Sequence, residues 1–485
     1  MAPSEANTKA GAPPRSVIAQ GSFFDRTFVR LTNLWRDLAD TVTGTGTVDA
    51  SLSADGDVRR LGDQMRACLD ARGGEVSARG RAAALGQTFL GLDKRGRERF
   101  LRLLAGAFDV DRKGVDSAVK ALLECTPDRR AHAEAALRQA LEPPRIRLLT
   151  QFNALPQGVK FLVDLRAELM EYTRKDATLA ALDDDLRRLL ASWFDIGFLE
   201  LRRITWDSPA TLLEKLIDYE AVHEIRGWED LKNRLDSDRR CFAFFHPRMP
   251  NEPLIFVEVA LVSGIADNVG DLLDETAPVV DPERNADTAI FYSISNAQQG
   301  LAGISFGGFL IKRVVDLLAR ELPGLKMFST LSPIPGFRRW LDEQLKTGVS
   351  LLLPAEAKKL FELTGVENDV TSLRQLLGRP NWHLDARMAE ALQAPLVRLC
   401  ARYLVNEKGR GNRARDPVAH FHLTNGARVE RVNWLGDTSE RGMRASAGLM
   451  VNYLYELDRI EENHERYTGD GGVTASSAVT RLLKS

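Results

Sequence analysis

The first part of the chain shows a helical spacing of apolar side chains. From Phe23 to Trp193, apolar residues recur every three or four positions between short polar stretches, which is the pattern of amphipathic helices. Runs rich in Val, Ile, Thr and aromatic residues are nearly absent there, so this segment predicts a helical bundle. We expect helices over residues 58–71, 95–108, 113–125, 130–141, 146–155, 158–175 and 177–194.

Near Gly197 the pattern changes to strands mixed with helices, which favours an α/β or α+β catalytic domain of about 270 residues. The apolar runs predict strands at 241–247, 254–262, 288–295 and 327–332, and helices at 307–321, at 337–347 and across 355–404. A strand pair at 420–425 and 427–437 and a closing helix at 445–457 complete the prediction.

Composition narrows the class of protein. The 485 residues are 44% apolar and 27% charged, with a formal net charge of −1, so no overall positive charge favours nucleic acid. Four widely spaced cysteines are typical of reduced, buried thiols. The N-terminus shows no signal peptide, and no apolar run approaches the roughly 20 residues that span a bilayer. We therefore expect a soluble cytoplasmic protein without nucleic-acid or membrane partners.

A glycine-rich turn between a predicted strand and a predicted helix is the first candidate site. Spaced glycines at 300–308 let the backbone approach a ligand, and a helix N-terminus favours phosphate. Lys312 and Arg313 add positive charge. The same turn holds Gly303-Ile304-Ser305-Phe306-Gly307, which matches the G-x-S-x-G nucleophile elbow, with Asp416 and His422 downstream in hydrolase order. Both interpretations stay open at this point.

Further candidates lie downstream. Ser332 precedes Pro333-Ile334-Pro335-Gly336, where two prolines stiffen the loop, so the hydroxyl either acts in chemistry or merely caps the loop. On a strand, His420 and His422 would lie on the same face. They could bind a metal, one of them could act as a general acid, or both could be structural. Three residues near the C-terminus could line a pocket: Asn452, Tyr453 and Tyr455. Their spacing is equally that of a buried helix.

Six segments together resemble malonyl-CoA decarboxylase, in the family's order, between about residues 198 and 457. The resemblance implies a helical N-terminal domain and a catalytic domain like the GNAT acetyltransferases, with a central mixed sheet flanked by helices. The predicted boundaries are a tail at 1–20, the helical domain at 21–196, the catalytic domain at 197–470 and a C-terminal tail at 471–485. The segments are RRITWDSPATLLEKLIDYEAVHEI, RRCFAFFHPRMPNEPLIFVEVAL, FYSISNAQQGLAGISFGGFLIKRVV, FSTLSPIPGF, DPVAHFHLTNGARVERVNWLGD and GLMVNYLYEL.

The resemblance also implies roles for particular residues. Ser332 and His422 match the family's active pair, whereas His420 lies outside it. It implies malonyl-CoA as substrate, no metal or organic cofactor, and a homotetramer formed through the helical domains. The peroxisomal C-terminal signal of some members is missing. The cradle for the coenzyme A pyrophosphate falls on Ala302, Gly303, Ile304, Ser305, Phe306, Gly307 and Gly308.

Two further functions remain as alternatives at this point. An acyltransferase would use the same coenzyme A cradle and would need a pocket for an acceptor amine. A non-catalytic acyl-CoA sensor would bind the thioester without turning it over.

Overall fold

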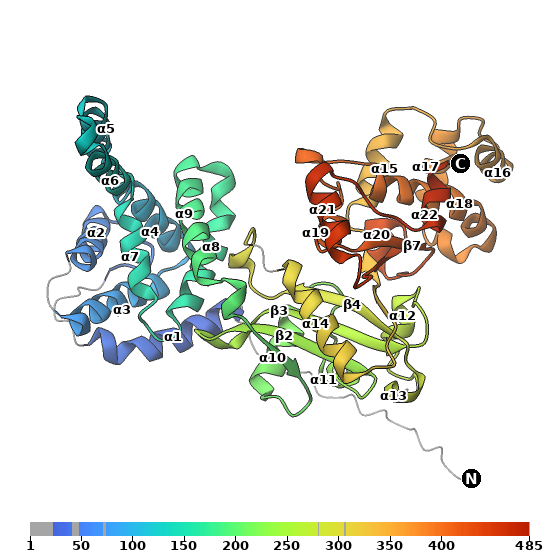
Figure 1. The fold of residues 1–485 in the computed structure, drawn as a ribbon, viewed down its shortest axis with the longest axis horizontal. Helices are drawn as coiled ribbons and strands as arrows, with labels where there is room; N and C mark the ends of the chain where they lie inside the picture. The colour runs from blue at the N-terminus through green and yellow to red at the C-terminus, as the bar shows by residue number, and fades with distance from the viewer. Residues whose placement is uncertain (1–22, 41–47, 71–73, 280, 305–306, 485) are drawn as a thin grey trace, which may run out of the picture. The chain divides into compact units, whose positions relative to one another are not determined.

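The computed structural model describes residues 23–40, 48–70, 74–279, 281–304 and 307–484 (Figure 1). The chain separates into two compact units, Met1–Leu186 and Arg187–Ser485. No helix in the described ranges is both long enough and apolar enough to cross a membrane. The predicted tail at 1–20 lies outside the described residues.

The first unit is helical, as its apolar spacing predicts. An aromatic cluster forms the core, in which the Phe161 ring lies 5.1 Å from Trp35 and 4.9 Å from Phe152, centre to centre. The helices are α1 (Phe23–Ala39), α2 (Asp55–Leu69), α3 (Glu75–Gly91), α4 (Lys94–Ala107), α5 (Arg112–Glu124), α6 (Arg130–Ala140), α7 (Pro144–Phe152), α8 (Gly158–Tyr172) and α9 (Ala177–Trp193), which runs into the second unit.

Helix α5 differs from the other helices of this unit, because none of its side chains is buried. Its apolar stripe includes Val119 and Leu123, and Leu123 is 80% exposed. It packs against α6, in which Ala133 is the one buried residue. The side of α5 that carries Val119 and Leu123 is therefore an exposed apolar face without a partner among the described residues of the chain.

The second unit is built on a mixed sheet in the order β1-β2-β3-β4-β5-β8-β6, with β7 paired to β8. Only β4 and β5 pair in parallel among the described strands; the other pairs are antiparallel. The strands are β1 (Glu200–Ile204), β2 (Arg239–His246), β3 (Met249–Val262), β4 (Thr288–Asn296), β5 (Met327–Thr330), β6 (Ser332–Pro333), β7 (Arg428–Asn433) and β8 (Met450–Leu454).

Helices surround this sheet, and the predicted fold class, a helical region followed by a mixed sheet with helices, is confirmed. They are α10 (Ala210–Tyr219), α11 (Trp228–Arg234), α12 (Val269–Leu272), α13 (Pro282–Asn285), α14 (Gly307–Glu321), α15 (Phe337–Lys346), α16 (Pro354–Thr364), α17 (Asp369–Leu377), α18 (Ala386–Val405), α19 (Pro417–Thr424), α20 (Glu440–Ser446), α21 (Ile460–Asp470) and α22 (Ser477–Lys484).

Two predicted elements are wrong in type. Residues 420–425 belong mostly to helix α19, because Asp416 caps the helix start and Pro417 occupies its first position. Residues 450–454, predicted within the closing helix, form strand β8, in which all five residues are buried. In addition, the predicted C-terminal tail contains α22, which packs on α18 and β7.

Candidate active site

The parallel strands β4 and β5 separate in the middle of the sheet. Their pairing runs from Thr288 opposite Met327 to Phe291 opposite Thr330. On its other side, β4 places Phe291 opposite Val259 and Ser293 opposite Glu258 of β3. Tyr292 therefore has no partner on β3 and forms a β-bulge. Such a bulge bends a strand. Beyond Leu331, whose N–H donates to the Phe291 carbonyl, no pairing between described residues joins β4 to the chain that follows β5.

Ser332 begins β6 beside this split, and His422 of α19 lies against it. The Ser332 Oγ is 3.1 Å from His422 Nε2 and 2.8 Å from Thr330 Oγ1. On the other side of the imidazole, Nδ1 is 2.8 Å from the Tyr455 hydroxyl. The Tyr453 ring stacks on the imidazole at 4.5 Å between centres. The structure thus brings together two predicted site residues that are 90 positions apart.

The hydrogen-bond directions imply one tautomer for this chain. Ser332 donates its hydroxyl proton to Thr330 Oγ1, so its oxygen is left to accept from His422 Nε2–H. A neutral imidazole carries one proton, so Nδ1 then accepts from the Tyr455 hydroxyl. Burial lowers the pKa of His422 to about 3 and raises the pKa of Tyr455 well above its ordinary value. Both groups are therefore neutral near pH 7.

A buried carboxylate connects the two segments that carry the pair. Asp416 Oδ1 caps α19 by accepting from the N–H of Val418 and of Ala419. Its Oδ2 accepts from the Gly336 N–H at 3.2 Å and from the Tyr403 hydroxyl at 3.3 Å. Burial raises the pKa of Asp416, and the backbone hydrogen bonds oppose that rise. Gly336 ends the loop that starts at Ser332, so one carboxylate fixes this loop to the His422 helix.

The glycine-rich turn follows β4 directly. Ala302 and Gly303 are exposed, and Gly303 has φ +77°, a backbone conformation that glycine adopts without strain. Gly307 and Gly308 begin α14, whose N-terminus follows the turn. Ser305 and Phe306 lie outside the described residues. The two positive charges expected to favour an anion at this turn already have partners. Lys312 pairs with Glu461 at 2.7 Å, and Arg313 donates to the Leu199 carbonyl.

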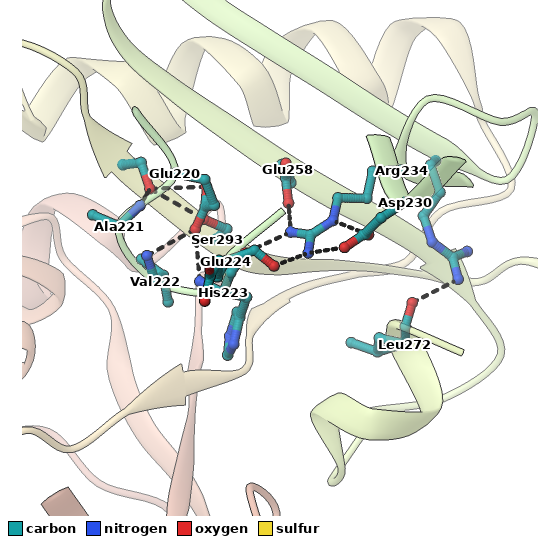
Figure 2. A network of polar contacts seen from close by, with 12 residues as sticks. Glu220, Ala221, Val222, His223, Glu224, Asp230, Arg234, Glu258, Leu272 and Ser293 are labelled. Carbon is teal, nitrogen blue, oxygen red and sulfur yellow. Dashed lines mark hydrogen bonds and ion pairs between the residues drawn. The ribbon is translucent and has the colours of Figure 1, made fainter. Parts of the chain in front are cut away.

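A polar network holds the part of β4 that lies beyond the bulge (Figure 2). Glu220 accepts from Ser293 and Ser295 of β4 and from the N–H of Val222 and of His223. This carboxylate ties the segment after α10 to the bent strand.

The same network continues through a buried arginine. Arg234 donates to the carbonyls of His223 and Glu224 and lies 3.0 Å from Glu258. Burial raises the pKa of Glu258 to about 7 even beside this guanidinium. The network therefore fixes the edge of the split through fully buried charged groups.

The other candidates have structural roles. Asn452 is fully buried, and its Nδ2 donates to the carbonyls of Thr330 and Ala266. His420 Nδ1 lies 2.8 Å from the Tyr467 hydroxyl, so the two histidines of α19 have separate partners. Sequence reasoning missed Thr330 and the clamp made by Asp416. The pair Asp416-Pro417 is a helix-start signal that could have located α19.

The fold and the site define an α+β enzyme with a buried, neutral serine–histidine pair beside a split sheet. Family models for the malonyl-CoA decarboxylase N-terminal and C-terminal domains match residues 108–194 and 197–485. The mitochondrial malonyl-CoA decarboxylases of Rattus norvegicus and Anser anser anser are each 40% identical to the chain. The matches cover 80% of this chain and 82% and 80% of the relatives.

Solved structures agree with these sequence relatives. Malonyl-CoA decarboxylases from Rhodopseudomonas palustris and Agrobacterium vitis match with TM-scores of 0.80 and 0.79, at 44% and 45% identity. Each match covers 87% of this chain and 99% of the solved one. The chain belongs to the malonyl-CoA decarboxylase family.

The Asp416 clamp predicts a stability effect. In Asp416→Asn, the amide NH₂ group would face the Gly336 N–H, because the side-chain oxygen still caps α19. The Gly336 N–H then loses its acceptor, which should lower the free energy of unfolding by about 2 kcal/mol. Urea unfolding should show this loss in free energy. Asp281→Asn is the matched control, because Asp281 caps α13 on the surface and clamps no second segment. Equal losses in both variants would contradict the clamp.

Proposed function

We propose that this chain converts malonyl-CoA to acetyl-CoA and CO₂, with Ser332 and His422 as the catalytic pair. The observation that carries the proposal is the buried contact between His422 Nε2 and Ser332 Oγ, which lie 3.1 Å apart. Membership of the malonyl-CoA decarboxylase family supports the choice of substrate.

The chemistry needs a proton donor rather than a base. When the bond between the α-carbon and the carboxylate breaks, CO₂ leaves and its electron pair forms a thioester enolate. That carbon is a strong base, so a neutral imidazole N–H delivers a proton to it, directly or through the Ser332 hydroxyl. Loss of the Nε2 proton leaves the negative charge on the imidazole, and the Tyr455 hydroxyl stabilises that charge by donating to Nδ1. Solvent then restores the proton that the product has taken.

Ser332 also positions the substrate in this proposal. Its hydroxyl proton turns from Thr330 toward the malonyl carboxylate or the thioester oxygen when malonyl-CoA binds. Low exposure of both residues, 5% for Ser332 and 3% for His422, keeps water from stabilising the carboxylate before CO₂ leaves. The thioester itself accepts the electrons, so the proposed reaction uses no metal and no organic cofactor.

We assign the binding of the coenzyme A part of the substrate to the split in the sheet and to the glycine-rich turn. Past the bulge, we assign the edge of β4 that faces the split to the amides of pantetheine, because no described strand pairs with that edge there. The turn at 302–308, which the N-terminus of α14 follows, suits the pyrophosphate, because helix N-termini attract anions. The substrate-binding residues that we propose are Ala302, Gly303, Ile304, Ser305, Phe306, Gly307, Gly308, Ser332 and His422, with Tyr455 supporting His422.

The hydrolase interpretation fits the geometry less well. Its nucleophile, Ser305, lies outside the described residues, and β4 ends at Asn296, seven residues before the first glycine of the motif. Its histidine, His422, has Nε2 3.1 Å from Ser332 Oγ instead. Asp416 does not contact His422 in any described interaction, and its carboxylate caps α19 instead. A tyrosine occupies the position behind the histidine.

The proton-donor role predicts a loss of turnover. His422→Asn removes the donor, so CO₂ release from malonyl-CoA should fall by about 100-fold or more in kcat. Ser332→Ala should also lower kcat rather than only raise KM for the thioester. His420→Asn is the control, since His420 bonds to Tyr467 outside the pair. Turnover of His422→Asn within about threefold of wild type, or an equal loss in His420→Asn, would refute the role.

The low pKa of His422 predicts the pH dependence. Its folded value of about 3 lies below the ordinary 6.5, so the imidazole stays neutral and kcat shows no inflection near pH 6.5. Between these values the unfolded chain binds a proton that the folded chain excludes, so stability falls as pH falls. The slope from this residue is up to about 1.4 kcal/mol per pH unit. Urea unfolding of wild type and His422→Asn from pH 7 to pH 5 measures it; parallel curves would contradict the assignment.

We also propose that the chain forms a homotetramer through its first unit and acts in the cytoplasm. The partnerless apolar face of α5, with Leu123 80% exposed, supports the assembly. The relatives from Rattus norvegicus and Anser anser anser are mitochondrial enzymes, so the cytoplasmic location is proposed for this chain alone.

Leu123→Asp tests the assembly. A buried charge in a subunit interface is costly, so light scattering after gel filtration should show a smaller species than wild type. Ser117→Asp on the opposite side of α5 should leave the mass unchanged. An unchanged mass in Leu123→Asp would exclude α5 from the interface.

A further inference from the structure

We propose that a pocket between α15, α17 and α20 of the second unit binds a small organic anion, a flat ring that carries a carboxylate or phosphate. The pocket holds about 590 Å³, within the usual range of sites for small molecules. Neither Ser332 nor His422 lines it. Its walls include Arg338, Arg379, Trp382, His383, Met443 and Arg444.

The charge of the lining favours an anion. Three arginines face two carboxylates, Asp342 and Glu440. Arg338 pairs with Asp342 and Arg444 pairs with Glu440, each one turn along its own helix. These pairs are partly or largely exposed and weak, so they exchange readily for a ligand.

Arg379 is the cation that the fold leaves available. No carboxylate among the described residues lies within ion-pair distance of it, and its described contact is a hydrogen bond to Met388 Sδ at 3.6 Å. A guanidinium offers a planar fork of N–H donors that suits a carboxylate or a phosphate. Arg379 therefore supplies the charge that the two intrahelical pairs do not use.

The apolar part of the pocket suits a flat ring. Trp382 is only 4% exposed and lies 5.8 Å from the Trp434 ring, between centres, so its position is fixed. Met443 adds a polarizable wall. His383 Nδ1 is buried without a hydrogen-bond partner in the described structure.

The pocket is connected to the catalytic loop through α15. Arg338 is the second residue of α15, and Gly336 just before that helix is fixed by Asp416. An occupant that pulls on Arg338 therefore acts at the end of the loop that starts with Ser332. Binding of an organic anion should change turnover without competing with the substrate.

The test uses the full chain and isothermal titration calorimetry, which detects binding whatever the absorbance or fluorescence of the probe. Adenosine monophosphate and indole-3-acetate, each titrated with saturating acetyl-CoA present, distinguish a phosphate-bearing from a carboxylate-bearing ring. Inorganic phosphate is the third probe. Saturating acetyl-CoA keeps the probes away from the proposed coenzyme A site, so failure here leaves the proposed function untouched.

We expect saturable binding of at least one ring-bearing anion, weakened about tenfold or more in Arg379→Gln by loss of a charged hydrogen bond. Arg284→Gln, which changes an exposed arginine of α13, should bind as wild type does. Arg379 is exposed, so its replacement should not unfold the chain. No saturation by any probe, saturation by inorganic phosphate alone, or equal binding by Arg379→Gln would each overturn the proposal.

Discussion

The Asp416 carboxylate is the constraint on which the site depends. It lies 80 residues beyond Gly336, and its two oxygens serve different segments. One oxygen starts the helix that carries His422, and the other holds the end of the loop that carries Ser332. The carboxylate is 1% exposed, so water does not compete for these hydrogen bonds. One side chain therefore links the two segments whose positions set the separation of the catalytic pair.

The bulge at Tyr292 has a comparable effect on the sheet. The pairing of β4 with β5 ends at Phe291, next to the extra residue, and a bulge of this kind bends a strand. The chain after β5 is then free to form the short β6, where Ser332 begins. The bulge at Tyr292 thus lies between the part of the sheet that we assign to coenzyme A binding and the part that carries Ser332. The Glu220 network holds the bent strand in that position.

Much of this fold could be predicted from the sequence, and the errors have a physical cause. Strands β2 to β5 and helix α14 were predicted because their apolar runs end at clear turn residues. Helix α19 and strand β8 were mistaken for each other's type, since both are short and few of their residues are exposed. A buried run has no polar face to reveal its period. Ser332 and His422 came from the resemblance to the family. The Tyr455 and Asp416 contacts required the structure, because a hydrogen-bond partner depends on packing.

The residue behind His422 sets the direction in which the site moves protons. A carboxylate at Nδ1 would hold a proton there, leave Nε2 as an acceptor and stabilise an imidazolium, which suits the activation of a nucleophile. Tyr455 reverses this polarity, because it donates to Nδ1 and leaves the proton on Nε2. Within the described part of the chain no charge favours the imidazolium, so burial keeps the ring neutral. A site that must give a proton to carbon gains from this polarity, which a serine hydrolase could not use.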